Sequence, residues 1–386
     1  MTKLGSICSF QSGGTPAKGK QEYFNGSIPW ITTTALNGTQ IDEKDAVDWI
    51  TERAINETAA KIVPAYSIMV GTRVGVGKVA INTVDMSTSQ DVISLLNIDE
   101  KNWSKEYICK FIQGKSSYLN SQARGATIKG IKIEVLSNLE VPTVDFKQQR
   151  FISETLDRVS SVISARKQEL QKLDDLIKAR FVEIFGDCRL NPKGWNTVAL
   201  GDIAEVGSSK RVFVEELKEI GIPFYRGTEV GALAEGKTVK PELFITENHY
   251  NELINATGKP ELGDLLMPSI CPDGRIWVVD TDKPFYFKDG RVLWVHKIDK
   301  KFDPVFLLYT LKDRIMADYG SIASGTTFAE LKIFALKQCQ VFDVPIADQR
   351  SFATFIAQID KSKAVIQKSL EEAQLLFDSL MQQYFG

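Results

Sequence analysis

Two stretches of the sequence, 147–186 and 347–386, contain no Pro and no Gly before their final residue. Apolar residues recur along both stretches at alternating intervals of three and four, which is the heptad repeat of a coiled coil. We therefore expect each stretch to form one long helix, whose apolar seam is stable in water only when another surface covers it. The predicted seam positions are Ile152, Leu156, Val159, Ile163, Leu170, Leu173, Ile177 and Ile184 in the first helix, and Phe352, Ile356, Ile359, Ile366, Leu370, Phe377, Leu380 and Tyr384 in the second.

The regions before the two stretches have a different pattern, in which Gly, Pro, Thr and Asn separate short runs rich in β-branched and aromatic residues. Such runs between turn residues predict strands. Short helices are expected between some of them, so an α+β fold suits these regions better than a parallel doubly wound sheet. The clearest predicted strands lie in 78–84, 91–98, 275–281 and 291–298, and the clearest short helices in 104–113 and 304–319.

The second half of the chain repeats the first. The motif LGSI at 4–7 returns as LGDI at 200–203, and the other matches follow in the same order, each displaced by about 200 residues. One such match is weak, but an ordered series indicates a tandem repeat. The further matched pairs are 28–30 with 222–224, 77–81 with 274–278, 125–127 with 325–327, 141–142 with 344–345, 149–150 with 349–350 and 185–186 with 385–386.

The repeat predicts the domain organisation. We expect globular domains at 1–146 and 187–346, each followed by a long helix, at 147–186 and 347–386. Two equivalent halves close most simply around a pseudo-two-fold axis, so the helices should form an antiparallel coiled coil with one domain at each end. Charged residues at three further seam positions can fix the register at some loss of stability; they are Arg166, Arg180 and Lys363.

Near the C-terminal end of each predicted helix the apolar surface becomes wider than the seam. One explanation is burial against the adjacent globular domain, and the other is a docking face for another subunit, present twice because the helix is repeated. The residues concerned are Leu176, Phe181, Phe185, Leu376, Met381 and Phe385.

The composition narrows the class of protein. The 386 residues include 47 Lys and Arg against 49 Asp and Glu, which argues against a polybasic tail or an acidic sequestering protein. No apolar run reaches the roughly 18 residues of a membrane span, and the N-terminus lacks the pattern of a secretory signal, so a cytoplasmic protein is expected. Five scattered Cys and two His make a disulfide framework or a Cys/His metal site unexpected.

Motifs for catalysis are missing as well. The segment 71–79, GTRVGVGKV, departs from a phosphate-binding loop in the spacing of its glycines and in the residue after the lysine, and a turn between strands is the better interpretation. The sequence contains no Pro-Pro pair, so the Asn-Pro-Pro-aromatic motif of an adenine methyltransferase is absent. We expect a protein without catalytic activity of its own.

The order of these features resembles the specificity subunit of type I restriction–modification enzymes. The resemblance covers essentially the whole chain and rests on the repeated LG-[SD]-I opening, on ARGATIKGI (123–131) and ASGTTFAEL (323–331), and on the Val-Pro and Gln-Arg pairs at each helix entry. Family members often have Glu-Gln at that entry, where this chain has Gln-Gln-Arg and Asp-Gln-Arg.

The resemblance implies a DNA-recognition subunit in a defence system against phage. Each globular domain would be a target recognition domain that reads one half of a bipartite, asymmetric DNA site, and the helices would set the spacing of the halves. Two modification (methyltransferase) subunits would dock on the chain, and two restriction (translocase and nuclease) subunits could complete the complex. S-adenosylmethionine, ATP and Mg would be bound by these partners only. The alternative is a two-headed coiled-coil scaffold that binds proteins and not DNA.

The DNA-contacting residues are expected among Arg, Lys, Gln and Thr on exposed loops, because these side chains bind phosphates and base edges. The stretch 110–132 contains five Lys or Arg and no acid, which makes it the best phosphate-facing segment of the first domain. We expect contacts from Arg73, Lys78, Gln90, Arg124, Thr127 and Lys129 in the first domain, and from Lys210, Arg211, Arg226, Arg275, Arg291 and Thr327 in the second.

Overall fold

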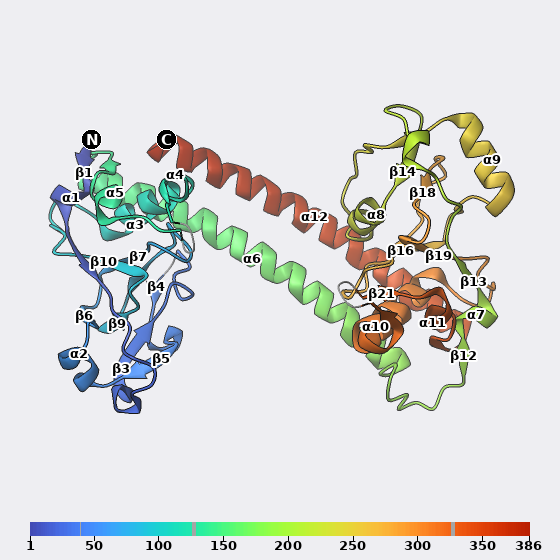
Figure 1. Cartoon of the computed structure of the whole chain (residues 1–386), viewed down its shortest axis with the longest axis horizontal. Coiled ribbons are helices and arrows are strands. Elements are labelled where there is room, and N and C mark those ends of the chain that lie inside the picture. The colour runs from blue at the N-terminus through green and yellow to red at the C-terminus, as the bar shows by residue number, and fades with distance from the viewer. Residues whose placement is uncertain (39, 126–128, 326–328) are drawn as a thin grey trace. The chain divides into compact units, whose positions relative to one another are not determined.

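The computed structural model describes residues 1–386 except 39, 126–128 and 326–328. The chain folds into two compact units, of which the first contains Met1–Gln168 and Ile366–Gly386 and the second contains Glu169–Val365 (Figure 1). Each unit therefore combines one globular domain with parts of both long helices.

The long helices are α6 (Phe146–Phe185) and α12 (Ile346–Phe385). In the first unit, the beginning of α6 shares a core with the end of α12, through Leu156 and Phe385. In the second unit, the end of α6 shares a core with the beginning of α12, through Ile177 and Phe352. Within each unit the two helical segments thus run in opposite directions, which confirms the predicted antiparallel pairing.

The predicted seam lies inside this pairing. All seam positions, including the charged ones, are buried or partly buried. In the second unit, Lys363 of α12 donates a hydrogen bond to Asp174 of α6, with 2.7 Å between Nζ and Oδ1. A lysine can therefore occupy the seam because a carboxylate of the facing helix neutralises its charge.

The globular domain of the first unit is built mainly from two sheets. One has the strand order β2-β10-β7-β8-β4 and the other β5-β3-β9-β6, and a small pair joins β1 to β11. Short helices cover them, and α3 packs on β8. The strands are β1 (Thr2–Lys3), β2 (Ser9–Ser12), β3 (Phe24–Ile31), β4 (Gln40–Ile41), β5 (Asp48–Ile50), β6 (Ile62–Val63), β7 (Ile68–Gly71), β8 (Val79–Asn82), β9 (Met86–Thr88), β10 (Val92–Leu96) and β11 (Glu140–Val141). The α-helices are α1 (Leu4–Ile7), α2 (Glu52–Glu57), α3 (Lys105–Gly114), α4 (Ser116–Gln122) and α5 (Ile133–Ser137).

The second unit repeats this plan. Its main sheet has the order β13-β19-β16-β17, equivalent to β2-β10-β7-β8, and the pair β12-β22 corresponds to β1-β11. The strands are β12 (Thr197–Ala199), β13 (Glu205–Gly207), β14 (Ile222–Tyr225), β15 (Phe244–Ile245), β16 (Leu265–Pro268), β17 (Trp277–Val278), β18 (Tyr286–Phe287), β19 (Val292–His296), β20 (Ala323–Ser324), β21 (Glu330–Leu331) and β22 (Gln340–Phe342). The α-helices are α7 (Leu200–Ile203), α8 (Gly227–Ala234), α9 (Glu247–Thr257), α10 (Pro304–Ile322) and α11 (Ile333–Lys337).

Both main sheets are largely antiparallel. Among the described strands the parallel pairings are β3 with β9, β4 with β8, and β14 with β18. The predicted α+β class is therefore confirmed, and a doubly wound parallel sheet is excluded for the part of the chain that the structure describes. Each strand run and short helix named from the sequence contains an element of the expected type.

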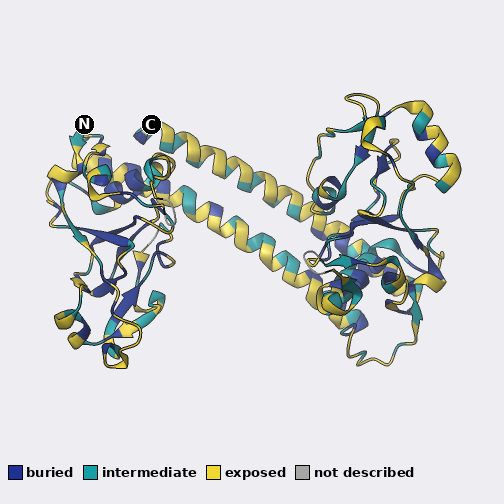
Figure 2. Ribbon diagram, viewed as in Figure 1, coloured by how far each residue is buried: buried dark blue, intermediate teal, exposed yellow. Residues whose placement is uncertain are grey.

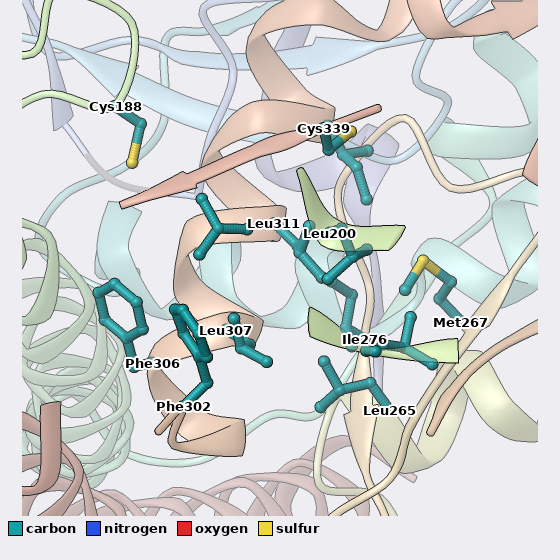
Figure 3. Close-up of a cluster of buried hydrophobic side chains, with 14 of the residues drawn as sticks. Cys188, Leu200, Leu265, Met267, Ile276, Phe302, Phe306, Leu307, Leu311 and Cys339 are labelled. Carbon is teal, nitrogen blue, oxygen red and sulfur yellow. The ribbon is translucent and has the colours of Figure 1, made fainter. Parts of the chain in front are cut away.

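In each domain, the ends of the two long helices complete the hydrophobic core. In the second unit, Phe306, Leu307 and Leu311 of α10 belong to the same buried cluster as Leu265 and Met267 of the main sheet (Figure 3). The apolar faces of the strands are buried in both domains, while the outer faces of α6 and α12 are exposed (Figure 2).

For half of the six residues named as docking candidates, the predicted docking role is wrong. Phe181, Phe185 and Phe385 have at most 6% of their surface exposed. Phe185 packs edge-on against Phe306 and Phe352 in the second unit. The Phe385 ring packs against the rings of Tyr107 and Phe111 in the first, so these phenylalanines are core residues and cannot receive another subunit. Of the others, Met381 is partly buried, whereas Leu176 and Leu376 are exposed.

A buried glutamine joins each long helix to the globular domain before it. Gln149 accepts a hydrogen bond from the Ser104 N–H (2.9 Å) and donates to the carbonyl oxygens of Asn102 and Val144 (2.9 Å each). In the second unit, Gln349 accepts from the Asp303 N–H (2.8 Å) and donates to the carbonyl oxygens of Lys301 (3.0 Å) and Val344 (2.8 Å). The repeated Gln-Arg motif of the sequence thus marks an equivalent backbone clamp.

Within the described residues, none of the helices is both long and apolar enough to cross a membrane. The same part of the chain contains no cluster of three or more His, Cys, Asp or Glu side chains that could hold a metal ion.

Candidate nucleic-acid interface

Three loops of the first domain meet at Thr72, in the turn between β7 and β8. The Thr72 N–H and hydroxyl both donate to the Asp91 carbonyl oxygen, at 2.8 and 3.1 Å. The Thr72 carbonyl oxygen accepts a hydrogen bond from the Ile131 N–H at 2.8 Å. This junction, which we call the Thr72 junction, holds together the loop segments 71–79 and 89–91 and, of the third loop, the described residues 123–125 and 129–131.

The Thr72 junction gathers the predicted first-domain contacts. Arg73, Lys78, Gln90, Arg124 and Lys129 all lie on its loops and all are exposed. Two backbone hydrogen bonds between Arg124 and Gly130, at 2.9 and 3.0 Å, fix the base of the third loop. Thr127 lies outside the described residues.

The second domain contains an equivalent junction at Ser269, after β16. The Ser269 N–H donates to the Arg291 carbonyl oxygen at 2.9 Å, and the Ser269 carbonyl oxygen accepts from the Leu331 N–H at 2.7 Å. We call this the Ser269 junction. It joins the turn that carries Arg275 to the loop 288–291 and to the strand pair β20–β21.

The remaining second-domain candidates lie close to this junction. Arg211 reaches the turn after β18, where its Nε donates to Asp289 at 3.1 Å, and Lys210 precedes it. Arg226 caps α8, whose first residue, Gly227, lies against Arg291 and Pro268. Thr327 is outside the part of the chain that the structure describes.

The two junctions differ in their charge. In the second domain the arginines are paired with carboxylates: Arg211 with Asp289, Arg226 with Glu229 and Glu242, Arg275 with Asp273 and Glu235, and Arg291 with Glu330. In the first domain Arg73 lies 3.5 Å from Asp91, but Lys78, Arg124 and Lys129 form no ion pair with another described residue. The first junction therefore presents uncompensated positive charge, and the second presents oriented guanidinium groups.

The sequence pattern indicated the cations but not their acidic partners. Asp273 and Arg275 are separated by a single residue, so their proximity could have been noticed. Glu330 and Arg291 are far apart in sequence, and only the fold brings them together.

Glu229 is the most perturbed of these acids. Burial by itself raises the pKa of its carboxyl group, but hydrogen bonds from the Arg226 guanidinium, the Arg226 N–H and the Thr228 hydroxyl outweigh burial and lower the pKa to about 2. Because the pKa is lower in the folded protein than in the unfolded chain, the carboxylate stabilises the fold above its ordinary pKa, and this contribution is lost as the pH falls towards 2.

We expect Glu229→Gln to lower the free energy of unfolding of the second unit at pH 7 by about 1–3 kcal/mol. The difference from the parent protein should shrink as the pH falls from about 4.5 to 2, because protonation then removes the same charge from the parent. Chemical denaturation at a series of pH values measures this. Glu252→Gln, at an exposed position of α9, should leave the profile unchanged; an equal effect of both variants would contradict the assignment.

Comparison with known proteins agrees with the repeated architecture. The family model described as "Type I restriction modification DNA specificity domain" matches twice, over residues 1–175 and 192–375. The chain is 25% identical to the "Type I restriction enzyme MjaIX specificity subunit" of Methanocaldococcus jannaschii, over 98% of this chain and 90% of that protein. It is 29% identical to the EcoR124I/EcoR124II specificity subunit of Escherichia coli, over 46% of this chain and 45% of that protein.

Solved structures show the same fold. The crystal structure of a type I restriction–modification S subunit from M. genitalium matches with a TM-score of 0.59 and 16% identity, over all of this chain and 95% of that one. A second structure, from work on assembly and conformational transition of the type I system, matches with a TM-score of 0.57 and 16% identity. The alternative of a scaffold that binds only proteins has no support among these matches. With both halves matched by one family model, the chain belongs to the type I restriction–modification DNA specificity family.

Proposed function

We propose that each globular domain reads one half of a bipartite DNA site, through the side chains around the Thr72 junction in the first domain and the Ser269 junction in the second. The observation that carries this proposal is that both domains build the same three-loop junction and surround it with exposed or partly exposed Arg and Lys. Cationic side chains on rigidly connected loops are suited to binding phosphates and base edges.

The two half-sites should differ in sequence. At the position equivalent to Lys78 the second domain has Arg275, and at the position equivalent to Asp91 it has Arg291. The acceptor Asp91 and the donor Arg291 prefer different bases, because a carboxylate accepts from cytosine N4 whereas a guanidinium donates to guanine. The long helices would then set the number of base pairs between the half-sites.

The chain itself would supply recognition, and partner subunits the chemistry. Two modification subunits, with S-adenosylmethionine, would methylate adenine; two restriction subunits, with ATP and Mg, could add translocation and cleavage. The exposed Leu176 and Leu376 on the outer faces of α6 and α12 are suited to contact a partner subunit. The charged side chains of this chain surround two equivalent loop junctions, which suits recognition. We therefore place the catalytic groups on the partner chains.

The test of this function uses the full chain assembled with its methyltransferase subunits. We expect methylated adenines to map to one split motif with two unlike halves at a fixed spacing. A continuous motif, or methylation without sequence preference, would contradict the proposal.

Phosphate attraction can be tested at the Thr72 junction with the double variant Arg124→Ala/Lys129→Ala. We expect weaker binding of the complex to all duplexes, and a salt dependence reduced by about one unit of log–log slope per lost phosphate contact. Affinity measured at several salt concentrations provides the readout. Lys101→Ala, which removes an exposed lysine elsewhere in the same domain, should change neither quantity; an unchanged slope in the double variant would argue against phosphate contacts here.

A further inference from the structure

Arg275 is the least exposed of the arginines that are paired with carboxylates at the Ser269 junction. Its Nε lies 2.8 Å from Asp273 Oδ2 and 3.0 Å from Oδ1, and its Nη1 lies 3.6 Å from Glu235 Oε1. The side chain as a whole is 35% exposed, and the contacts with Asp273 and Glu235 orient its guanidinium. Such a side chain loses little conformational freedom when it binds a ligand.

A glycine in α8 provides the space for this guanidinium. A Cβ atom at Gly231 would lie 2.9 Å from Nη1 of Arg275 and 3.4 Å from its Cζ, so the group rests against bare helix backbone. Glycine inside a helix costs about 1 kcal/mol relative to alanine. Helix stability therefore does not explain glycine at this position, whereas the packing of Arg275 does.

These contacts leave one edge of the guanidinium available. Asp273 occupies Nε, and Glu235 is too distant from Nη1 for a hydrogen bond. Nη1 lies against the α8 backbone at Gly231, but no hydrogen bond to a described residue uses Nη1 or Nη2. Their N–H groups can therefore act as parallel donors, the arrangement that matches O6 and N7 of guanine in the major groove.

The other arginines of this junction are less suited. Arg226 uses both Nε and Nη2 on Glu229, and Nη2 also on Glu242. Arg291 has Nη1 against Glu330. Arg211 is 69% exposed with a single carboxylate partner, so its guanidinium is weakly oriented.

We infer that Arg275 is a specificity-determining residue that reads a guanine in the second half-site, and that Asp273 and Gly231 are its positioning residues. This inference rests on the proposed function. The inference predicts which base the domain selects at one position. The proposed function requires only that the domain as a whole recognises DNA sequence.

The test uses the full chain with its methyltransferase subunits and a duplex library randomised in the second half-site. The parent complex should select guanine at one position, and Arg275→Ala should reduce that preference by about 5- to 150-fold while other positions keep theirs. Arg275→Lys retains the charge without the planar fork, so it should weaken the guanine preference but keep the salt dependence. Asp273→Asn should weaken the preference at the same position.

Gly231→Ala supplies an independent readout. The added methyl group should displace Arg275 and reduce the same guanine preference, while the thermal midpoint of the second unit does not fall, because alanine favours the helix. Arg189→Ala is the matched control, since it removes another arginine of the second unit that is paired with an acid, Asp318, and should leave the preference intact.

Three outcomes would overturn the inference without affecting the proposed function: Arg275→Ala keeps the guanine preference, Arg275→Ala weakens all sequences equally, or Arg189→Ala removes the preference. A parent complex that selects no sequence in either half-site would overturn both.

Discussion

Replacing Phe385 by alanine is expected to lower the free energy of unfolding of the first unit by about 3–5 kcal/mol. Phe385 lies in the last turn of α12, is 3% exposed, and has its ring 5.2 Å from that of Tyr107 and 5.8 Å from that of Phe111. Its removal leaves a cavity in the core between α3 and α12. Hydrogen exchange should show reduced protection of α3, while the amides of α10 in the second unit keep theirs.

Leu375→Ala is the matched control for this experiment. Leu375 belongs to the same helix but is 72% exposed, so its truncation should change stability by no more than about 0.5 kcal/mol. Equal protection of α3 in Phe385→Ala and the parent protein would show that the end of α12 does not contribute to the first core.

The second large effect is expected for Gln349→Ala, which should destabilise the second unit by about 2–4 kcal/mol. The side chain is fully buried, and its loss leaves the Asp303 N–H and the carbonyl oxygens of Lys301 and Val344 without this partner. Unpaired buried polar groups cost about 1–3 kcal/mol each when water cannot replace the lost bond. Denaturant titration followed by hydrogen exchange at the start of α10 measures the loss.

Gln358→Ala, one of the exposed glutamines of α12, should be nearly neutral. Gln149→Ala should reproduce the large effect in the first unit, because its three hydrogen bonds are equivalent. If Gln349→Ala and Gln149→Ala were as stable as Gln358→Ala, the buried glutamines would have no role in joining the long helices to the domains.

The sequence predicted those features that depend on local periodicity. The heptad spacing of residues such as Ile152 and Phe352 is a property of consecutive turns, so it identified the buried faces of both helices. The sequence could not decide whether Phe185 served a core or an interface, because its partners Phe306 and Phe352 lie far along the chain.

The candidate site could likewise be predicted only where it depends on the repeated sequence pattern. The repeat placed Lys78 and Arg275 at equivalent positions, and both lie beside equivalent junctions. The pairing of Arg291 with Glu330 and the packing of Arg275 on Gly231 depend on loops brought together by the sheet, and no short-range pattern marks them.

The composition of the two units has a consequence for synthesis on the ribosome. The second unit is one continuous stretch, Glu169–Val365, whereas the first needs Ile366–Gly386 in addition to Met1–Gln168. The second unit can therefore complete its core as soon as its last residue emerges from the exit tunnel. The first unit cannot complete its core until the last turns of α12 have been synthesised, and until then the surface that receives α12 is uncovered. The first unit therefore has the greater need of a chaperone.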